Sequence, residues 1–91
     1  GRSLGHGSGT LTTFPASLGD DRLRHMLTSH DHCAVLKVGR HFHRLRAILE
    51  QLGRLETSVL LSDIGWPDET IRNASEVVER PPYFSILLTS R

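Results

Sequence analysis

Apolar residues along the chain follow two different spacings, one typical of helices and one typical of buried strands. In segments 17–30 and 41–53 they recur every three or four residues, which places them on one face of a helix. In the second segment they are Phe42, Leu45, Ile48, Leu49 and Leu52. Segment Cys33–Val38 is instead a nearly continuous apolar run, which predicts a buried, central strand.

Polar residues and glycine mark the ends of both predicted helices. Ser17 precedes the acidic pair Asp20 and Asp21, so we expect it to cap the first helix, whose positive end favours carboxylates. Gly53 follows the second helix and predicts a left-handed stop. In that helix we expect His43, Arg44 and Arg46 to lie at the surface.

Four further strands complete the predicted fold. A short strand at Leu11–Phe14 ends at Pro15, and the others lie at 57–64, 70–75 and 83–90. Helical crossovers connect parallel neighbours, whereas the short late connections permit an antiparallel pair. The sequence therefore predicts a single α/β layered domain with a mixed, mostly parallel five-stranded sheet and two main helices.

The first nine residues differ in composition from the rest. They hold four glycines and two serines, which predicts a flexible linker before a domain at 10–91. The pattern GHGSG at Gly5–Gly9 is not placed between a buried strand and a helix, as a phosphate-binding loop requires. We therefore assign it no phosphate site.

Composition argues against several classes of partner. The 91 residues carry a formal net charge of +1, so no strong field attracts nucleic acid or an anionic membrane surface. The longest apolar runs are far shorter than the ~20 residues that span a bilayer. The single cysteine, Cys33, excludes an internal disulfide and no signal peptide is visible, so we expect a cytoplasmic protein.

The stretch GRHFHRLR, which begins at Gly39, is rich in histidine and arginine but predicts no site. On a helix His41 and His43 point ~200° apart and do not share a metal ion. The arginines are not interleaved with exposed aromatic residues, which argues against a platform for single-stranded nucleic acid. His30–Cys33 (HDHC) lacks a second ligand pair at a zinc spacing. We predict no metal site, and the catalytic residues stay unassigned.

Four segments in order nevertheless resemble the second half of the tetrapyrrole methyltransferases of the corrin pathway. They are TLTTFPASLGDDRLRHML, AVLKVGRHFHRLRAILEQLG, VLLSDIGWPDETI and PPYFSILLTSR, and together they cover Thr10 to Arg91. Among these enzymes the resemblance is strongest to those that methylate precorrin-2 at C-20. It implies the second domain of a two-domain fold, with the methyl donor S-adenosylmethionine and the tetrapyrrole in the cleft between the domains.

The resemblance also implies which residues contact the donor. The candidate cofactor-binding residues are Leu36, Lys37, Ile64, Gly65, Asn73, Ala74 and Ser75. Core packing explains Leu36 and Ile64 equally well. The implied partners are a tetrapyrrole substrate, an N-terminal domain and a second copy in a homodimer, and the chain alone is expected to be inactive.

Two alternatives remain open at this stage. One is a non-catalytic protein-interaction domain that presents its charged second helix to a partner. The other is the same half of a methylase that acts on another corrin precursor. A substrate-facing first half would distinguish the C-20 methylase from a methylase that acts on another precursor. Affinity for the methyl donor would distinguish both of them from the interaction domain.

Overall fold

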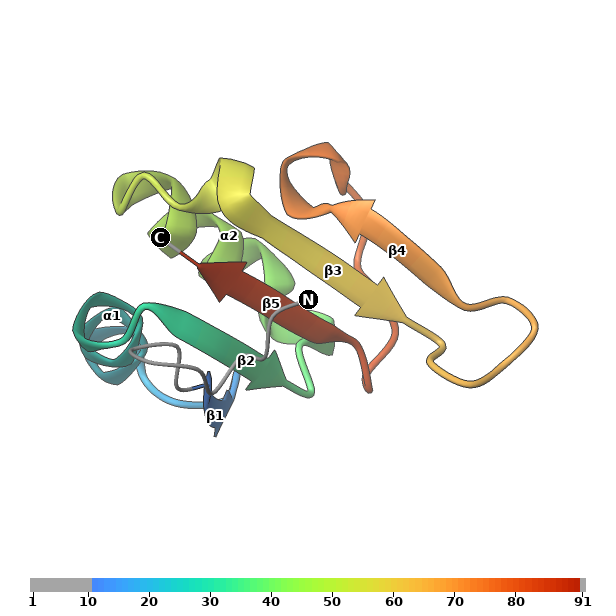
Figure 1. Ribbon diagram of the computed structural model, residues 1–91, viewed down its shortest axis with the longest axis horizontal. Coiled ribbons are helices and arrows are strands. Elements are labelled where there is room, and N and C mark those ends of the chain that lie inside the picture. The colour runs from blue at the N-terminus through green and yellow to red at the C-terminus, as the bar shows by residue number, and fades with distance from the viewer. Residues whose placement is uncertain (1–10, 91) are drawn as a thin grey trace.

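The computed structural model describes residues 11–90, which form one sheet and two main helices (Figure 1). The helices are α1 (Asp20–Ser29) and α2 (Phe42–Gln51). The strands are β1 (Leu11–Pro15), β2 (His32–Leu36), β3 (Ser58–Ser62), β4 (Thr70–Asn73) and β5 (Ile86–Ser90). Short 3-10 turns occur at Gly39–His41, Leu55–Thr57 and Ala74–Glu76. The predicted linker at 1–9 and the Gly5–Gly9 pattern lie outside the described residues.

The sheet has the strand order β1-β2-β5-β3-β4 and is mixed, as predicted. It is not mostly parallel: β1 pairs with β2 in parallel, but the β2–β5, β5–β3 and β3–β4 pairs are antiparallel. The reason is the placement of the last strand, which enters between β2 and β3 and runs against both. Strand order of this kind depends on long-range pairing, which the crossover rule for β1–α1–β2 does not report.

Both helices pack on one face of the sheet. Leu23 and Leu27 of α1 share a core with Phe42, Leu45, Ile48 and Leu49 of α2 and with alternate strand residues, which include Phe14, Val35, Leu60 and Leu87. Figure 1 shows α2 behind β5 and β3. The predicted inward face of the second helix is thereby confirmed, with Leu52 half-buried against the same core.

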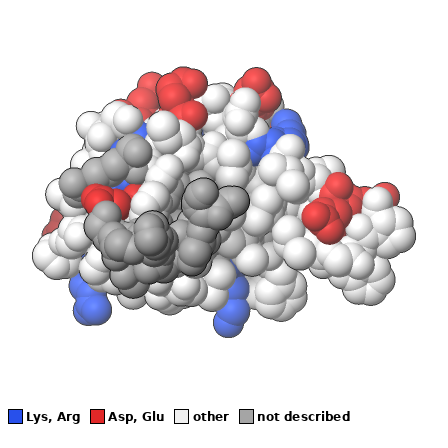
Figure 2. Space-filling view, viewed as in Figure 1, with Lys and Arg blue, Asp and Glu red and all other residues white. Residues whose placement is uncertain are grey.

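The opposite face of the sheet is apolar and is covered by neither α1 nor α2. Strand register places Leu11, Ala34, Leu36, Val59, Leu61, Ile71, Ile86 and Leu88 on it. Ile71 is 66% exposed. In the view of Figure 2, charged side chains gather towards the margins of this face. Neither helix within residues 11–90 has the length and the apolar run needed to cross a bilayer.

Two sequence-based expectations about polar residues are wrong. The N-cap of α1 is Gly19, which makes no side-chain hydrogen bond, so Ser17 does not cap the helix. Arg44 and Arg46 are half-buried rather than solvated. Arg44 donates to the carbonyls of Ala16 (2.8 Å) and Leu18 (2.9 Å) and pairs with Asp20 (2.6 Å). The segment before α1 is therefore stabilised by a side chain of α2, a contact that local patterns do not indicate.

Candidate functional site

One end of the sheet gathers several loops that are far apart in the sequence. Strands β2 and β3 run in the same direction and finish there, while β5 begins between them. We call this end, with residues 36–41, 63–66 and 80–85, the loop end; it faces the lower right in Figure 1. Ligands of layered α/β folds commonly bind beyond the carboxyl ends of strands, so the loop end is the first place to search.

Four of the predicted cofactor-binding residues lie at the loop end. Leu36 is the last residue of β2 and is half-buried, and Lys37 follows it with an exposed side chain. Ile64 and Gly65 follow β3, and Ile64 is 45% exposed. Neither Leu36 nor Ile64 belongs to the buried core. Core packing alone therefore does not account for these two side chains.

The backbone turns sharply at both of these strand ends. Lys37 and Asp63 adopt left-handed conformations with φ of 56° each, which non-glycine residues rarely do. Gly65 has φ 86° and its amide donates to a Glu69 carboxylate oxygen at 3.0 Å. Such conformations concentrate at binding sites, where the surrounding structure holds them. The two loops thus present defined backbone groups at the loop end.

A third segment at the loop end was missed by the sequence-based site prediction. Residues 80–85 pass close to the turn after β2: the Val38 amide donates to the Ser85 carbonyl at 3.0 Å. A Cβ added at Gly39 would lie 3.0 Å from the Tyr83 Cα, so only glycine allows this approach without a shift. The double proline at Pro81–Pro82 before the last strand was the sequence signal for a fixed loop here.

The remaining predicted residues, Asn73, Ala74 and Ser75, lie at the opposite end of the sheet. Asn73 pairs with Val59 near the start of β3, whereas Ser62 at the end of β3 pairs with Thr70. Ala74 is buried, and the Ser75 carbonyl accepts a hydrogen bond from Arg46 at 3.0 Å. The structure does not bring these three residues together with Leu36, Lys37, Ile64 and Gly65.

An apolar pocket of about 230 Å³ opens at the loop end. Its lining is Asp63, Ile64, Trp66, Pro82, Tyr83, Phe84 and Ile86. Trp66 is 71% and Phe84 73% exposed, and the Tyr83 and Phe84 rings meet edge to face with centroids 4.7 Å apart. Trp66 therefore has little to cover it among the described residues. Flat apolar walls with nearby backbone amides suit a planar organic ligand.

A second pocket, of about 270 Å³, adjoins the first through Tyr83. Gly39, Arg40, Arg80 and Pro81 form the rest of its lining. The turn after β2 contributes Arg40, and the loop before β5 contributes Arg80. The loop end therefore combines an apolar pocket with a cationic one.

His41 lies beside this cationic region and is polarised by it. Burial lowers the pKa of His41 below its ordinary value, and the positive charges of Arg44 and Arg40 lower it further. The neutral ring can accept a hydrogen bond from Arg44, whose Nη2 lies 3.0 Å from Nδ1 of His41. His43 instead lies exposed, with its ring edge near Phe42. Within residues 11–90, no three histidine, cysteine or acidic side chains gather closely enough to hold a metal ion.

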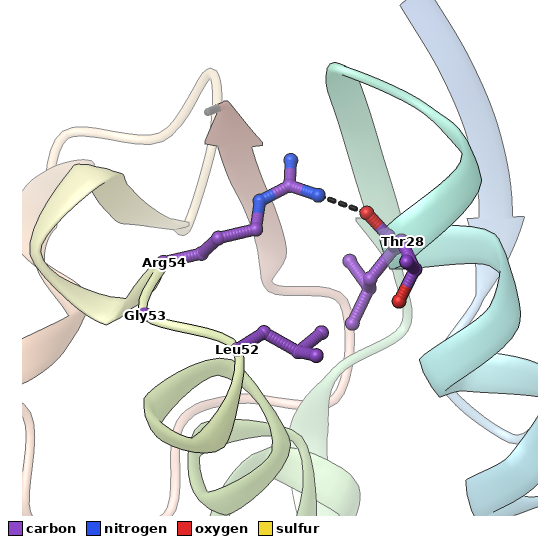
Figure 3. A pocket seen from close by; sticks show the side chains of 5 residues that line it. Thr28, Leu52, Gly53 and Arg54 are labelled. Carbon is purple, nitrogen blue, oxygen red and sulfur yellow. Dashed lines mark hydrogen bonds between the residues drawn. The ribbon is translucent and has the colours of Figure 1, made fainter.

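A pocket of about 300 Å³ at the other end of α2 is structural in character (Figure 3). Arg54, only 5% exposed, donates there to the carbonyls of Leu27, His30 (3.1 Å) and Asp31 (3.0 Å). These carbonyls lie at and just beyond the C-terminus of α1, where helix carbonyls lack intrahelical partners. The guanidinium thus closes the helix end through hydrogen bonds from its two terminal nitrogens.

Comparison with known proteins finds a similar sequence and a similar structure. The chain is 32% identical over 85 residues to cobalt-precorrin-2 C(20)-methyltransferase of Salmonella typhimurium, a match that covers 90% of this chain. The crystal structure of uroporphyrin-III C-methyl transferase from Thermus thermophilus, complexed with S-adenyl homocysteine, matches with a TM-score of 0.65 at 20% identity and covers 100% of this chain. The chain is similar in sequence and in fold to tetrapyrrole methyltransferases.

This relationship confirms the family resemblance and the fold that it implied. The chain spans 36% of the length of the Salmonella tetrapyrrole methyltransferase and 44% of the Thermus one. No model of a protein family matches the chain. Both tetrapyrrole methyltransferases therefore contain a large part that has no counterpart among the 91 residues.

Proposed function

We propose that the chain is the C-terminal part of an S-adenosylmethionine-dependent methyltransferase that methylates precorrin-2 at C-20 in cobalamin biosynthesis. The observation that carries this proposal is the 32% identity to cobalt-precorrin-2 C(20)-methyltransferase across 90% of the chain. The fold of a methyltransferase solved with S-adenyl homocysteine supports the choice of donor. A cytoplasmic location and a homodimer belong to the same proposal.

The proposed donor surface is the loop end. Leu36 and Lys37 lie at the end of β2 there, and Ile64 and Gly65 follow β3, with β5 between the two strands. Adenine is bound mainly by flat apolar contacts and a few backbone hydrogen bonds, which these loops can supply. Asn73, Ala74 and Ser75 are left out of the proposed surface because they lie at the opposite end of the sheet.

Methyl transfer from a sulfonium to carbon makes modest demands on protein side chains. The sulfur, methyl group and attacking carbon must be held in line, and water must be kept away. An open surface with exposed Trp66 and Phe84 does neither by itself. The chain alone is therefore proposed to be inactive, because a second domain has to complete the cleft.

Calorimetric titration with S-adenosylhomocysteine tests whether the site is incomplete. We expect weak binding or none, because the proposed donor cleft lies between two domains and this chain supplies only one of them. A sub-micromolar Kd, worth more than about 8 kcal/mol, would mean that the chain holds a complete donor site.

Activity can be tested in a chimera in which this chain replaces the matching region of the Salmonella enzyme. Labelled methyl transfer to precorrin-2 is the expected result, with a corrin precursor methylated at another position as the control substrate. A folded chimera without donor affinity would favour the non-catalytic interaction domain.

A further inference from the structure

Two arginines at the loop end share a pocket although they are far apart in the sequence. Arg40 belongs to the 3-10 turn before α2, and Arg80 lies in the loop that leads to β5. The close approach of Gly39 to Tyr83 brings their segments together around a cavity of about 270 Å³. The pocket is thus fixed by backbone packing.

Neither arginine side chain holds another segment of the fold among the residues that the structure describes. Arg44, Arg46 and Arg54 hold backbone carbonyls, and Arg72 pairs with Glu79. The side chains of Arg40 and Arg80 make no hydrogen bond or ion pair with residues 11–90, and both residues are exposed. Glu79, next to Arg80 in the chain, is already engaged by Arg72. Arg40 and Arg80 therefore line one pocket as two cations with which no acidic residue among 11–90 pairs.

The chemistry of the pocket selects a carboxylate attached to a flat molecule. Guanidinium groups bind carboxylates with two parallel hydrogen bonds, which lysine does not reproduce. Tyr83, 57% exposed, forms the wall shared with the apolar pocket, so a planar ring on that side can place a side chain between the arginines. A cavity of this volume accommodates a short carboxylate arm rather than a whole macrocycle.

We propose that Arg40 and Arg80 bind a peripheral carboxylate of the tetrapyrrole substrate and so orient the macrocycle over Tyr83. This inference rests on the proposed function, because it takes the substrate class from it. The amino-acid end of the methyl donor carries a carboxylate too, so the shared chemistry is a carboxylate and the experiment must separate the two sources.

The test uses uroporphyrin III, a planar tetrapyrrole with carboxylate side chains, and follows its fluorescence anisotropy with the 91-residue chain. We expect the R40Q/R80Q double variant to weaken binding at least tenfold and to lose most of the salt dependence. The matched control is R22Q, which removes an exposed arginine of α1 and should change binding less than twofold. Circular dichroism checks that all three proteins fold.

Several outcomes would overturn the inference. They are the absence of porphyrin binding by the wild-type chain at low salt, equal binding by the double variant, and an equal loss in R22Q. In the chimera, a double variant that loses affinity for S-adenosylhomocysteine but keeps its porphyrin affinity would assign the pocket to the donor instead. Failure of the proposed function gives a different result. If the chimera transfers no methyl group but porphyrin binding still depends on both arginines, the carboxylate pocket stands and the methyltransferase function is refuted.

Discussion

Three arginines connect segments that are distant in the sequence. Arg44 binds carbonyls before α1, Arg46 binds the Ser75 carbonyl, and Arg54 binds carbonyls at the end of α1. Each guanidinium has five N–H donors in a rigid fork, so one side chain can satisfy several carbonyls that helix ends leave unpaired. Net charge and apolar periodicity carry no information about such contacts. For this reason they were found only in the structure.

Arg54 offers the sharpest test at the residue scale. Arg54→Ala removes a buried cation and leaves the carbonyls of Leu27, His30 and Asp31 without their donors, so we expect a loss of about 2–4 kcal/mol in the free energy of unfolding. Arg54→Lys should fall between wild type and alanine, since an ammonium lacks the fork. Urea denaturation measures all three.

The control for this measurement is Arg22→Ala, because Arg22 lies exposed on α1 and should contribute within about 0.5 kcal/mol. If Arg54→Ala and Arg22→Ala were equally stable, the carbonyls would be satisfied by water and the buried cation would not stabilise the helix end.

At the scale of elements, local patterns predicted what depends on local geometry. The spacing of apolar residues predicted both helices, and φ 73° at Gly53 confirms the left-handed stop. Strand β5 was predicted from its composition, but its neighbours depend on contacts with residues more than 20 positions away. In the candidate site, the family resemblance implied the loops after β2 and β3, whereas the place of residues 80–85 beside them depends on the strand order.

Two substitutions in α2, one at a buried and one at an exposed residue, test which face of the helix packs against the core. Leu45 is fully buried in the core, so Leu45→Ala should reduce the free energy of unfolding by about 2–5 kcal/mol. His43 is exposed two residues earlier, and His43→Ala should change it by less than about 0.5 kcal/mol. Chemical denaturation of both variants is sufficient. A larger loss for His43→Ala would contradict the packing of α2 and require a role for this histidine.

At the scale of the whole molecule, residues 11–90 leave apolar surface exposed at the loop end and on the sheet face opposite the helices. The sheet face opposite the helices is apolar, and the loop end exposes Ile64, Trp66, Tyr83 and Phe84. Contiguous apolar surface on a small protein commonly marks an interface. The proposed function assigns this surface to the contact with a second domain. The same surface gives the isolated chain a means of self-association.

We therefore expect the isolated chain to associate as its concentration rises, in part through the loop end. Trp66 and Phe84 are more than two-thirds exposed, so W66S/F84S removes two large apolar side chains without opening the core. Sedimentation velocity over a wide concentration range should show weaker association of this variant than of wild type. Val78→Ser is the control, because Val78 is 77% exposed and lines neither pocket of the loop end.

Acrylamide should quench the fluorescence of Trp66 strongly in dilute wild-type protein and less as the protein associates. A strictly monomeric chain with a protected tryptophan would contradict this account, because the loop end would then close on itself and the self-contained interaction domain would explain the molecule better.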